Sequence, residues 1–161
     1  MANKIYQIAE TAITWLASGG IETFTPTSLA TANGRQGAHH DFGTSARSRL
    51  FEWRAWMKPG GTRVVGEAVR VYLKTSDGTH PDNDDGTGDI ALSSADKLRN
   101  VRQLGAIVID ENAAVEMAAS GIVEIAARYA APIFYNATAN TLSATAADFG
   151  FSLTPIPDEV Q

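Results

Sequence analysis

The sequence predicts a single all-β domain over residues 1–161, a jelly-roll-like sandwich of about eight antiparallel strands. Three observations lead to this prediction. The 161 residues suffice for one domain with a sizeable core, and 44% of them are apolar, as in globular proteins. Short runs with strand-like alternation recur along the chain, and glycine or proline turn signals separate them. We therefore expect a two-layer β fold.

Two runs in the middle of the chain have the clearest strand pattern. Residues 50–58 place a row of apolar side chains on one face, namely Phe51, Trp53, Ala55 and Met57. Residues 65–74 alternate in the same way apart from Glu67, and their expected inward residues are Val65, Val69, Val71 and Leu73. Pro59-Gly60-Gly61 ends the first run and Thr75-Ser76-Asp77-Gly78 ends the second. The pair could form a hairpin or a connection between sheets.

The remaining strands are shorter. Four later runs read as strands, at residues 104–109, 121–127, 131–136 and 149–154. Pro132 lacks an N–H donor, which places the third of these near a strand start or a sheet edge. Residues 93–99 favour one short helical turn with Ser93 or Ser94 as its N-cap.

The beginning of the chain allows two interpretations. Residues 13–16 and 22–29 would form a first strand pair around Ser18-Gly19-Gly20. Apolar residues from Ile5 to Leu16 also fit a helical period. We favour a strand preceded by an extended arm over residues 1–12.

Composition limits the classes of function. There is no cysteine, which excludes disulfides, thiolate metal sites and thiol catalysis. Five of the 18 acidic residues lie within residues 77–89, and the other thirteen equal the thirteen Lys and Arg residues in number. No basic stripe is present, so we expect no nucleic-acid partner. No apolar run of membrane-spanning length is present, so we expect a soluble chain without a membrane partner.

The acidic segment is the strongest metal candidate in the sequence. It reads DGTHPDNDDGTGD, and carboxylates of Asp82, Asp84 and Asp85 could hold Ca²⁺. With Gly86 at the sixth position of an EF-hand, however, Pro81 and Leu92 would stand where carboxylates are required. We favour a solvated loop and predict no metal site.

His39-His40-Asp41 is the other suggestive cluster. Adjacent residues of an extended chain point to opposite faces, so the two histidines are poorly placed to share a metal ion. No nucleophile-elbow motif and no dinucleotide-binding motif occurs. We therefore predict no catalytic residue, no cofactor and no enzymatic activity.

Aromatic residues offer a possible partner surface. Several could form a sugar-stacking platform, namely Trp15, Trp53, Trp56, Tyr72 and Tyr135. Phe51 and Trp53 share one face of their run and are expected in the core. Trp56 falls on the opposite face and is the best interface candidate.

Six strings give the chain a resemblance to small virion proteins of tailed bacteriophages. They are SLATANGRQGAHHD (28–41), LFEWRAW (50–56), VYLKTSDGTHPD (71–82), LGAIVID (104–110), EIAARYAAPIFYN (124–136) and LTPIPDEVQ (153–161). The chain resembles jelly-roll head decoration, or cement, proteins. That resemblance implies an oligomer on the outer surface of the phage head, made in the host cytoplasm, with the major capsid protein as partner.

The two ends of the chain fit this role as arms. Residues 154–161 would form an extended C-terminal arm stiffened by Pro155 and Pro157, which are further interface candidates. Two other functions stay open, a carbohydrate-binding β-sandwich module centred on Trp56 and a phage tail or baseplate component.

Overall fold

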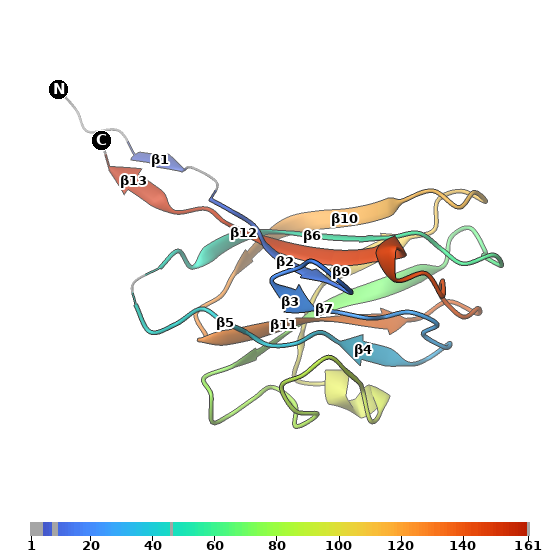
Figure 1. The fold of residues 1–161 in the computed structure, drawn as a ribbon, viewed down its shortest axis with the longest axis horizontal. Coiled ribbons are helices and arrows are strands. Elements are labelled where there is room, and N and C mark those ends of the chain that lie inside the picture. Colours follow the sequence, from blue (N-terminus) through green and yellow to red (C-terminus); the bar gives the residue numbers. More distant parts are fainter. Residues whose placement is uncertain (1–4, 8–9, 46, 161) are drawn as a thin grey trace.

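The computed structural model describes residues 5–7, 10–45 and 47–160, which form thirteen strands and two short 3₁₀ helices (Figure 1). In chain order the elements are β1 (Ile5–Gln7), β2 (Ile13–Leu16), β3 (Glu22–Thr23), β4 (Gly34–Gln36), β5 (His40–Asp41), β6 (Leu50–Met57), β7 (Ala68–Ser76), β8 (Ile90–Ala91), η1 (Ala95–Leu98), β9 (Arg102–Val108), β10 (Met117–Glu124), β11 (Tyr129–Asn136), η2 (Ala146–Asp148), β12 (Phe149–Pro155) and β13 (Asp158–Val160). The predicted all-β class is confirmed.

Two sheets form the body of the sandwich. The first has the strand order β10-β6-β12-β2-β3, and we call it sheet 1. The second, sheet 2, has the order β8-β4-β11-β7-β9, and β5 also pairs with β11. β6 lies in sheet 1 and β7 in sheet 2, so the two central runs are joined by a connection between the sheets rather than by a hairpin.

The order of strand pairing shows that the chain folds back on itself like one long hairpin, which is rolled up into the two sheets. Eight of the eleven strands in the two sheets form nested pairs, and the first of the eight, β2, pairs with the last, β12. Moving inward along the chain, β4 pairs with β11, β6 with β10 and β7 with β9, all antiparallel. This nesting of pairs is the jelly-roll arrangement. It brings the two ends of the chain side by side.

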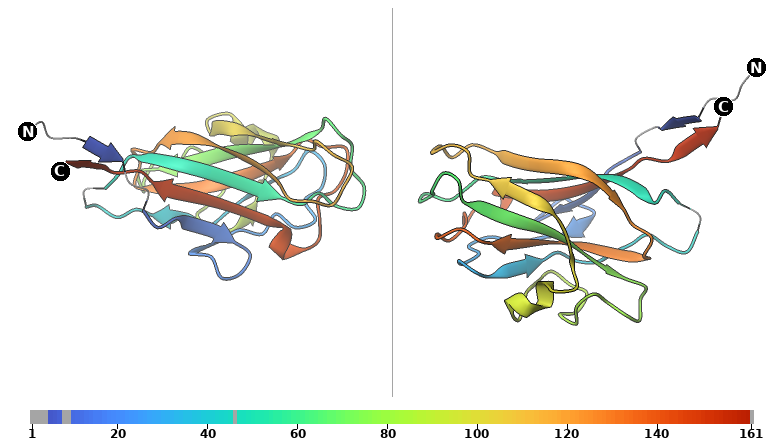
Figure 2. Two further views of the ribbon diagram at one scale, coloured as in Figure 1. Left: turned by 90° about the horizontal axis from the view of Figure 1, so that it is seen from above. Right: turned by 180° about the vertical axis from the view of Figure 1, so that it is seen from behind.

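The two ends continue as a two-stranded ribbon. β1 pairs with β13 from Ile5 opposite Val160 to Gln7 opposite Asp158. The ribbon projects away from the sandwich beyond β2 and β12 (Figures 1 and 2). Thr154 and Pro155 belong to β12, so the C-terminal extension starts later than the sequence suggested.

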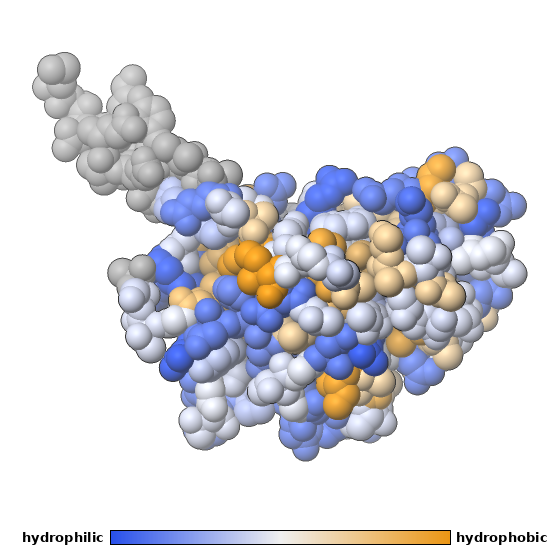
Figure 3. All heavy atoms as spheres, in the orientation of Figure 1, coloured by the Kyte–Doolittle hydropathy of each residue, from blue (hydrophilic) through white to orange (hydrophobic). Residues whose placement is uncertain are grey.

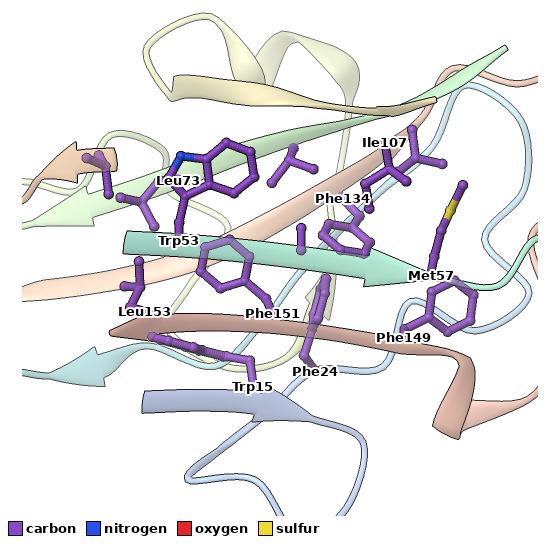
Figure 4. Packing of buried hydrophobic residues seen from close by; sticks show 14 of the residues in the cluster. Trp15, Phe24, Trp53, Met57, Leu73, Ile107, Phe134, Phe149, Phe151 and Leu153 are labelled. Carbon is purple, nitrogen blue, oxygen red and sulfur yellow. The ribbon is translucent and has the colours of Figure 1, made fainter. Parts of the chain in front are cut away.

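The core lies between the two sheets (Figure 4). Large buried side chains come from sheet 1, among them Trp15, Trp53, Phe149 and Phe151, and from sheet 2, among them Leu73, Ile107 and Phe134. Phe24 and Phe134 meet edge to face with ring centroids 4.8 Å apart. The prediction that Phe51 and Trp53 are core residues is confirmed, since they are 1% and 4% exposed.

A second, smaller core covers the outside of sheet 2. Tyr72, Val101 and Ile133 are buried there, and Leu92 and Leu98 pack against them. These contacts come from the long connection between β7 and β9, which includes η1. The helical turn expected at residues 93–99 is present, with Ser94 at the N-cap position but without a side-chain capping bond. β7 is therefore buried on both faces along most of its length.

The structure corrects the expected start of the strand at residues 65–74. Gly66 adopts a positive φ of 92°, which turns the chain before β7 begins at Ala68. Val65, expected to point inward, is 54% exposed. Val69, Val71 and Leu73 are fully buried, as the alternation predicted.

The first strand pair also differs from the prediction. Only Glu22 and Thr23 form β3, and they run parallel to β2 instead of completing a hairpin. The strand stops because the Thr25 N–H donates to the carboxylate of Asp89 at 3.3 Å and Pro26 has no N–H to donate. Residues 13–16 form β2 as predicted, and the helical alternative is not adopted at the described residues; residues 1–4 and 8–9 of the expected arm lie outside them.

Pro132 lies inside a central strand rather than at an edge. β11 runs between β7 and the segments β4 and β5. The N–H and C=O of one strand residue point to the same side. The Pro132 carbonyl accepts from the Gly37 N–H at 2.9 Å, in the gap between β4 and β5. A proline is tolerated because its missing donor faces this break in the ladder.

Two single substitutions test the corrected inward face of β7. We expect Val71→Ala to lower the free energy of unfolding by about 2 kcal/mol, because two buried methyl groups are lost from the core. Val65→Ala should change it by less than about 0.5 kcal/mol, because Val65 is exposed. Urea denaturation of both variants measures the difference, and equal losses would contradict the placement of Val65.

Candidate functional site

The outer face of sheet 1 is the first candidate surface. Its central row, on β6, consists of Leu50, Glu52, Arg54 and Trp56. In the view from above in Figure 2, β6 and β12 lie in front with no other segment across them. Sheet 2, by contrast, is covered by the connection between β7 and β9. The open face of the sandwich is therefore that of sheet 1.

Trp56 lies flat on this face. A Cβ atom added to Gly150, its neighbour on β12, would lie 2.0 Å from Cζ2 of Trp56, so the indole rests directly on the Gly150 backbone. Trp56 remains partly exposed. The prediction that it faces away from Phe51 and Trp53 is confirmed, while its role as an interface residue stays a prediction.

Small and polar residues surround the indole. Ala118 on β10 lies opposite Trp56, and Ser120 and Ser152 flank Arg54 on the two neighbouring strands. Ile122, next to Glu52, is 63% exposed. Figure 3, in the orientation of Figure 1, views the sandwich along the edges of its sheets, where apolar residues form separate patches among hydrophilic ones. The small neighbours on β10 and β12 keep the face of sheet 1 low around Trp56 and Arg54, and its charges are Glu52 and Arg54 on β6 and Glu124 at the end of β10.

The base of the terminal ribbon contains the other predicted interface residues. The Pro155 carbonyl accepts from the Glu10 N–H at 3.0 Å, which holds the two ends together. Pro157 lines a hollow of about 610 Å³ at this place, together with Glu10, Arg47, Ser48, Arg49, Leu50, Glu124 and Ile156. The structure brings Pro155 and Pro157 to one end of the sandwich and does not bring them to Trp56.

Arg47 has a structural role beside this hollow. Its guanidinium lies 4.4 Å from the centre of the Phe42 ring. It donates to the carbonyl of Ser48 at 3.0 Å and to that of Ile125 at 3.1 Å. These contacts fasten the β5–β6 connection to the end of β10.

Each carboxylate of the acidic loop has its own partner within the protein. Asp77 accepts from the N–H groups of Thr79 at 2.7 Å and His80 at 2.6 Å. Asp82 accepts from the N–H and the hydroxyl of Thr75 at 2.6 and 2.9 Å. The three remaining acids pair with side chains: Asp84 with Lys97, Asp85 with Ser93 and Asp89 with Arg35.

Lys74 on β7 binds the backbone of this loop. This residue was not identified as a candidate from the sequence. It is fully buried on the outer side of β7, and its ammonium donates to the Gly86 carbonyl at 2.7 Å. The buried Gln36 amide donates to the Gly86 and Gly88 carbonyls, both at 3.2 Å. Burial lowers the pKa of Lys74, and the nearby acids, Asp85 foremost, oppose this. The usable signal was a lysine inside an apolar strand directly before an acidic run.

The acidic loop does not gather its carboxylates around one point. Among the described residues, no group of three or more His, Asp and Glu side chains is arranged to hold a metal ion. Asp82, Asp84 and Asp85 point to different partners, as the bonds above show. The loop is a hydrogen-bonded cover on sheet 2.

The cluster His39-His40-Asp41 is also divided among different neighbours. The His39 ring lies beside Tyr129, with centroids 6.5 Å apart, and the His40 Nδ1 lies 3.0 Å from Glu22. Asp41 accepts two bonds from Arg128, at 2.8 and 2.7 Å. His39 and Tyr129 line a second hollow of about 610 Å³ under the acidic loop. Burial, and to a smaller extent the charge of Lys74, lowers the pKa of His39 to about 4.

The described part of the chain has no helix of the length and apolar character needed to cross a membrane. Comparison with protein-family models finds no match, and comparison with curated protein sequences finds none either.

The low pKa of His39 predicts a pH dependence of stability. His39 is neutral in the folded protein down to about pH 4, whereas an unfolded histidine binds a proton near pH 6.5. The unfolded chain therefore binds more protons between these values, and stability should fall as pH falls from 7 to 4.5, by at most about 1.4 kcal/mol per pH unit for this group. Urea denaturation across this range measures the slope.

Two histidine variants serve to assign that slope. His39→Gln should flatten it, because the titrating group is removed. His80→Gln is the control, because His80 is 83% exposed and should leave most of the slope in place. A wild-type slope that survives in His39→Gln would contradict the assignment.

The bonding within the acidic loop predicts no response to calcium. Because each carboxylate already has a partner, about 5 mM CaCl₂ should shift the melting temperature by less than about 1 °C. A differential scanning fluorimetry titration with MgCl₂ as the matched salt checks this. A saturable, calcium-specific rise that Asp84→Asn abolishes would show that the loop is a Ca²⁺ site after all.

Proposed function

We propose that this chain is a non-enzymatic structural protein of a bacteriophage virion, a head decoration protein that binds the outside of the major capsid shell and stabilises it. The proposal starts from the sequence resemblance described above. The observation that carries it furthest is the projecting ribbon of β1 and β13, which joins the two ends of the chain into one arm on a rigid body.

The ribbon has the properties of an attachment element. A two-stranded ribbon leaves unpaired backbone groups along both outer edges, and a neighbouring chain can add a strand to such an edge. Its base is held by the Glu10–Pro155 bond and by the Ile156 N–H, which donates to the Leu50 carbonyl at 2.9 Å, so its origin on the sandwich is fixed. A body that clamps adjacent capsid subunits needs a rigid core and an extension of this kind.

The jelly-roll body agrees with the same role. This fold recurs in viral capsid proteins and lectins, so it is compatible with a surface function without specifying one. The five acids of the loop are tied down within the protein, and the outer face of sheet 1 has few charges. Binding would then depend on buried area spread over the surface rather than on a catalytic constellation.

Phage heads prepared without this protein test the proposal. They should assemble but lose integrity at lower temperature than complete heads, and adding the purified protein should restore them through saturable binding. Deleting residues 1–9 together with 157–161 should weaken binding by at least tenfold, about 1.4 kcal/mol, while the melting curve shows that the sandwich stays folded. Heads of unchanged thermal stability would contradict the decoration role.

The number of copies of this protein per virion distinguishes a head decoration protein from a tail or baseplate component. Quantitative mass spectrometry of purified virions should find the protein in numbers comparable to those of the major capsid protein. A few copies per particle would instead assign it to the tail or baseplate.

A carbohydrate-binding module is the second candidate, and the flat, partly exposed indole of Trp56 favours it. Aromatic rings of this kind present an apolar face to a partner. A glycan array decides the matter: binding that Trp56→Ala abolishes supports the module, and an array without ligands removes it.

A further inference from the structure

We propose that the outer face of sheet 1 binds the same face of a second copy of this chain, around a two-fold axis that passes at the level of Trp53. The feature that carries this inference is the outward row of β6, which reads apolar, negative, positive, apolar as Leu50, Glu52, Arg54 and Trp56. The inference does not depend on the virion role, because it follows from the chemistry of this row.

The row is complementary to itself when reversed. In a two-fold pair the partner strand runs in the opposite direction over β6, so Glu52 lies opposite the partner's Arg54 and Arg54 opposite the partner's Glu52. At the two ends of the row, Trp56 lies opposite the partner's Leu50, and Leu50 opposite the partner's Trp56. Within this row every charge meets an opposite charge and every apolar group an apolar group, while Glu124, level with Leu50 at the end of the edge strand β10, lies over the partner's Ala118.

The surroundings of the row allow two sheets to approach closely. Packed sheets lie about 10 Å apart and their side chains interdigitate, so small neighbours leave room for the partner's row. Trp56 lies flat because Gly150 has no side chain. Ala118, Ser120 and Ser152 are the neighbours of Trp56 and Arg54 on the adjacent strands. The side chains next to Trp56 and Arg54 are therefore small enough for the partner's row to approach.

Exposed apolar surface at the edge adds to the same contact. Ile122 on β10 is 63% exposed and sits level with Glu52. The two-fold operation places it over the partner's Ser120, where its side chain becomes covered. Arg54 now lies 3.8 Å from Glu116 with both groups about half exposed, so it can turn toward the partner's Glu52 at little cost.

The area of the face determines how strongly we expect two copies to bind each other. Four strands of up to eight residues span roughly 19 by 27 Å, which gives about 500 Å² per copy. This lies at the low end of specific interfaces, so we expect a concentration-dependent dimer. We expect a dissociation constant of about 10–100 μM that rises with salt as the Glu52–Arg54 pairs are screened.

Sedimentation velocity of charge-reversal variants tests the proposal. Glu52→Arg places two arginines in the row and Arg54→Glu places two glutamates, so each variant alone should dimerise at least tenfold more weakly than the wild type. An equimolar mixture should form a heterodimer, because the two arginines of the first variant then face the two glutamates of the second. The double variant Glu52→Arg/Arg54→Glu should dimerise like the wild type.

Arg70→Glu is the matched control. It makes the same change of charge at an exposed strand position of sheet 2 and should leave the dimer intact. A wild type that stays monomeric up to about 1 mM overturns the proposal. So does a dimer that is unaffected by the single reversals, or a mixture of the two variants that stays monomeric.

Discussion

The packing of Trp53 between the two sheets is the constraint on which the rest of the structure depends. A Cβ on Gly121, its partner on β10, would lie 2.9 Å from the indole Nε1, and one on Gly105, on β9 of the other sheet, would lie 3.1 Å from Cη2. The indole therefore fits between the sheets because Gly121 leaves room beside Nε1, and a side chain at Gly105 would press on it from the other sheet. The outer face of β6 shows the same packing of an indole on a glycine, because Trp56 rests on Gly150. β6 thus provides both the indole that lies between the two sheets and the indole that lies flat on the outer face.

The two faces of the sandwich differ because the acidic loop covers only one of them. On sheet 2, Lys74 and Gln36 reach the loop carbonyls, and a small apolar core lies beside them. A buried ammonium is costly unless its surroundings compensate it, and Asp82, Asp84 and Asp85 supply negative charge nearby. These acids thus act as counter-charges of the protein's own lysine. None of the described segments covers sheet 1 in this way, which leaves its face open for contacts.

Sequence patterns predicted the elements whose burial follows simple alternation. Phe51, Trp53 and Leu73 point inward as expected, because a strand with one buried face repeats every two residues. Val65 was misplaced because the turn at Gly66 interrupts that period. The early end of β3 depends on Asp89, and the central position of Pro132 depends on β4 and β5, and no local pattern records these distant partners.

The sequence predicted some features of the candidate surfaces and not others, again because a local pattern does not record contacts between distant segments. The outward position of Trp56 follows from its parity with Trp53, whereas the glycine beneath it comes from a strand 94 residues later. The meeting of the two ends follows from the topology alone: once β2 pairs with β12, the segments beyond them leave the body at one place. Because the ribbon leaves the sandwich on the side of sheet 1 in Figure 1, a second copy stacked on that sheet would lie next to the ribbon. The arm and the open face would then act together, with the face joining two copies and the arms free to reach a shared support.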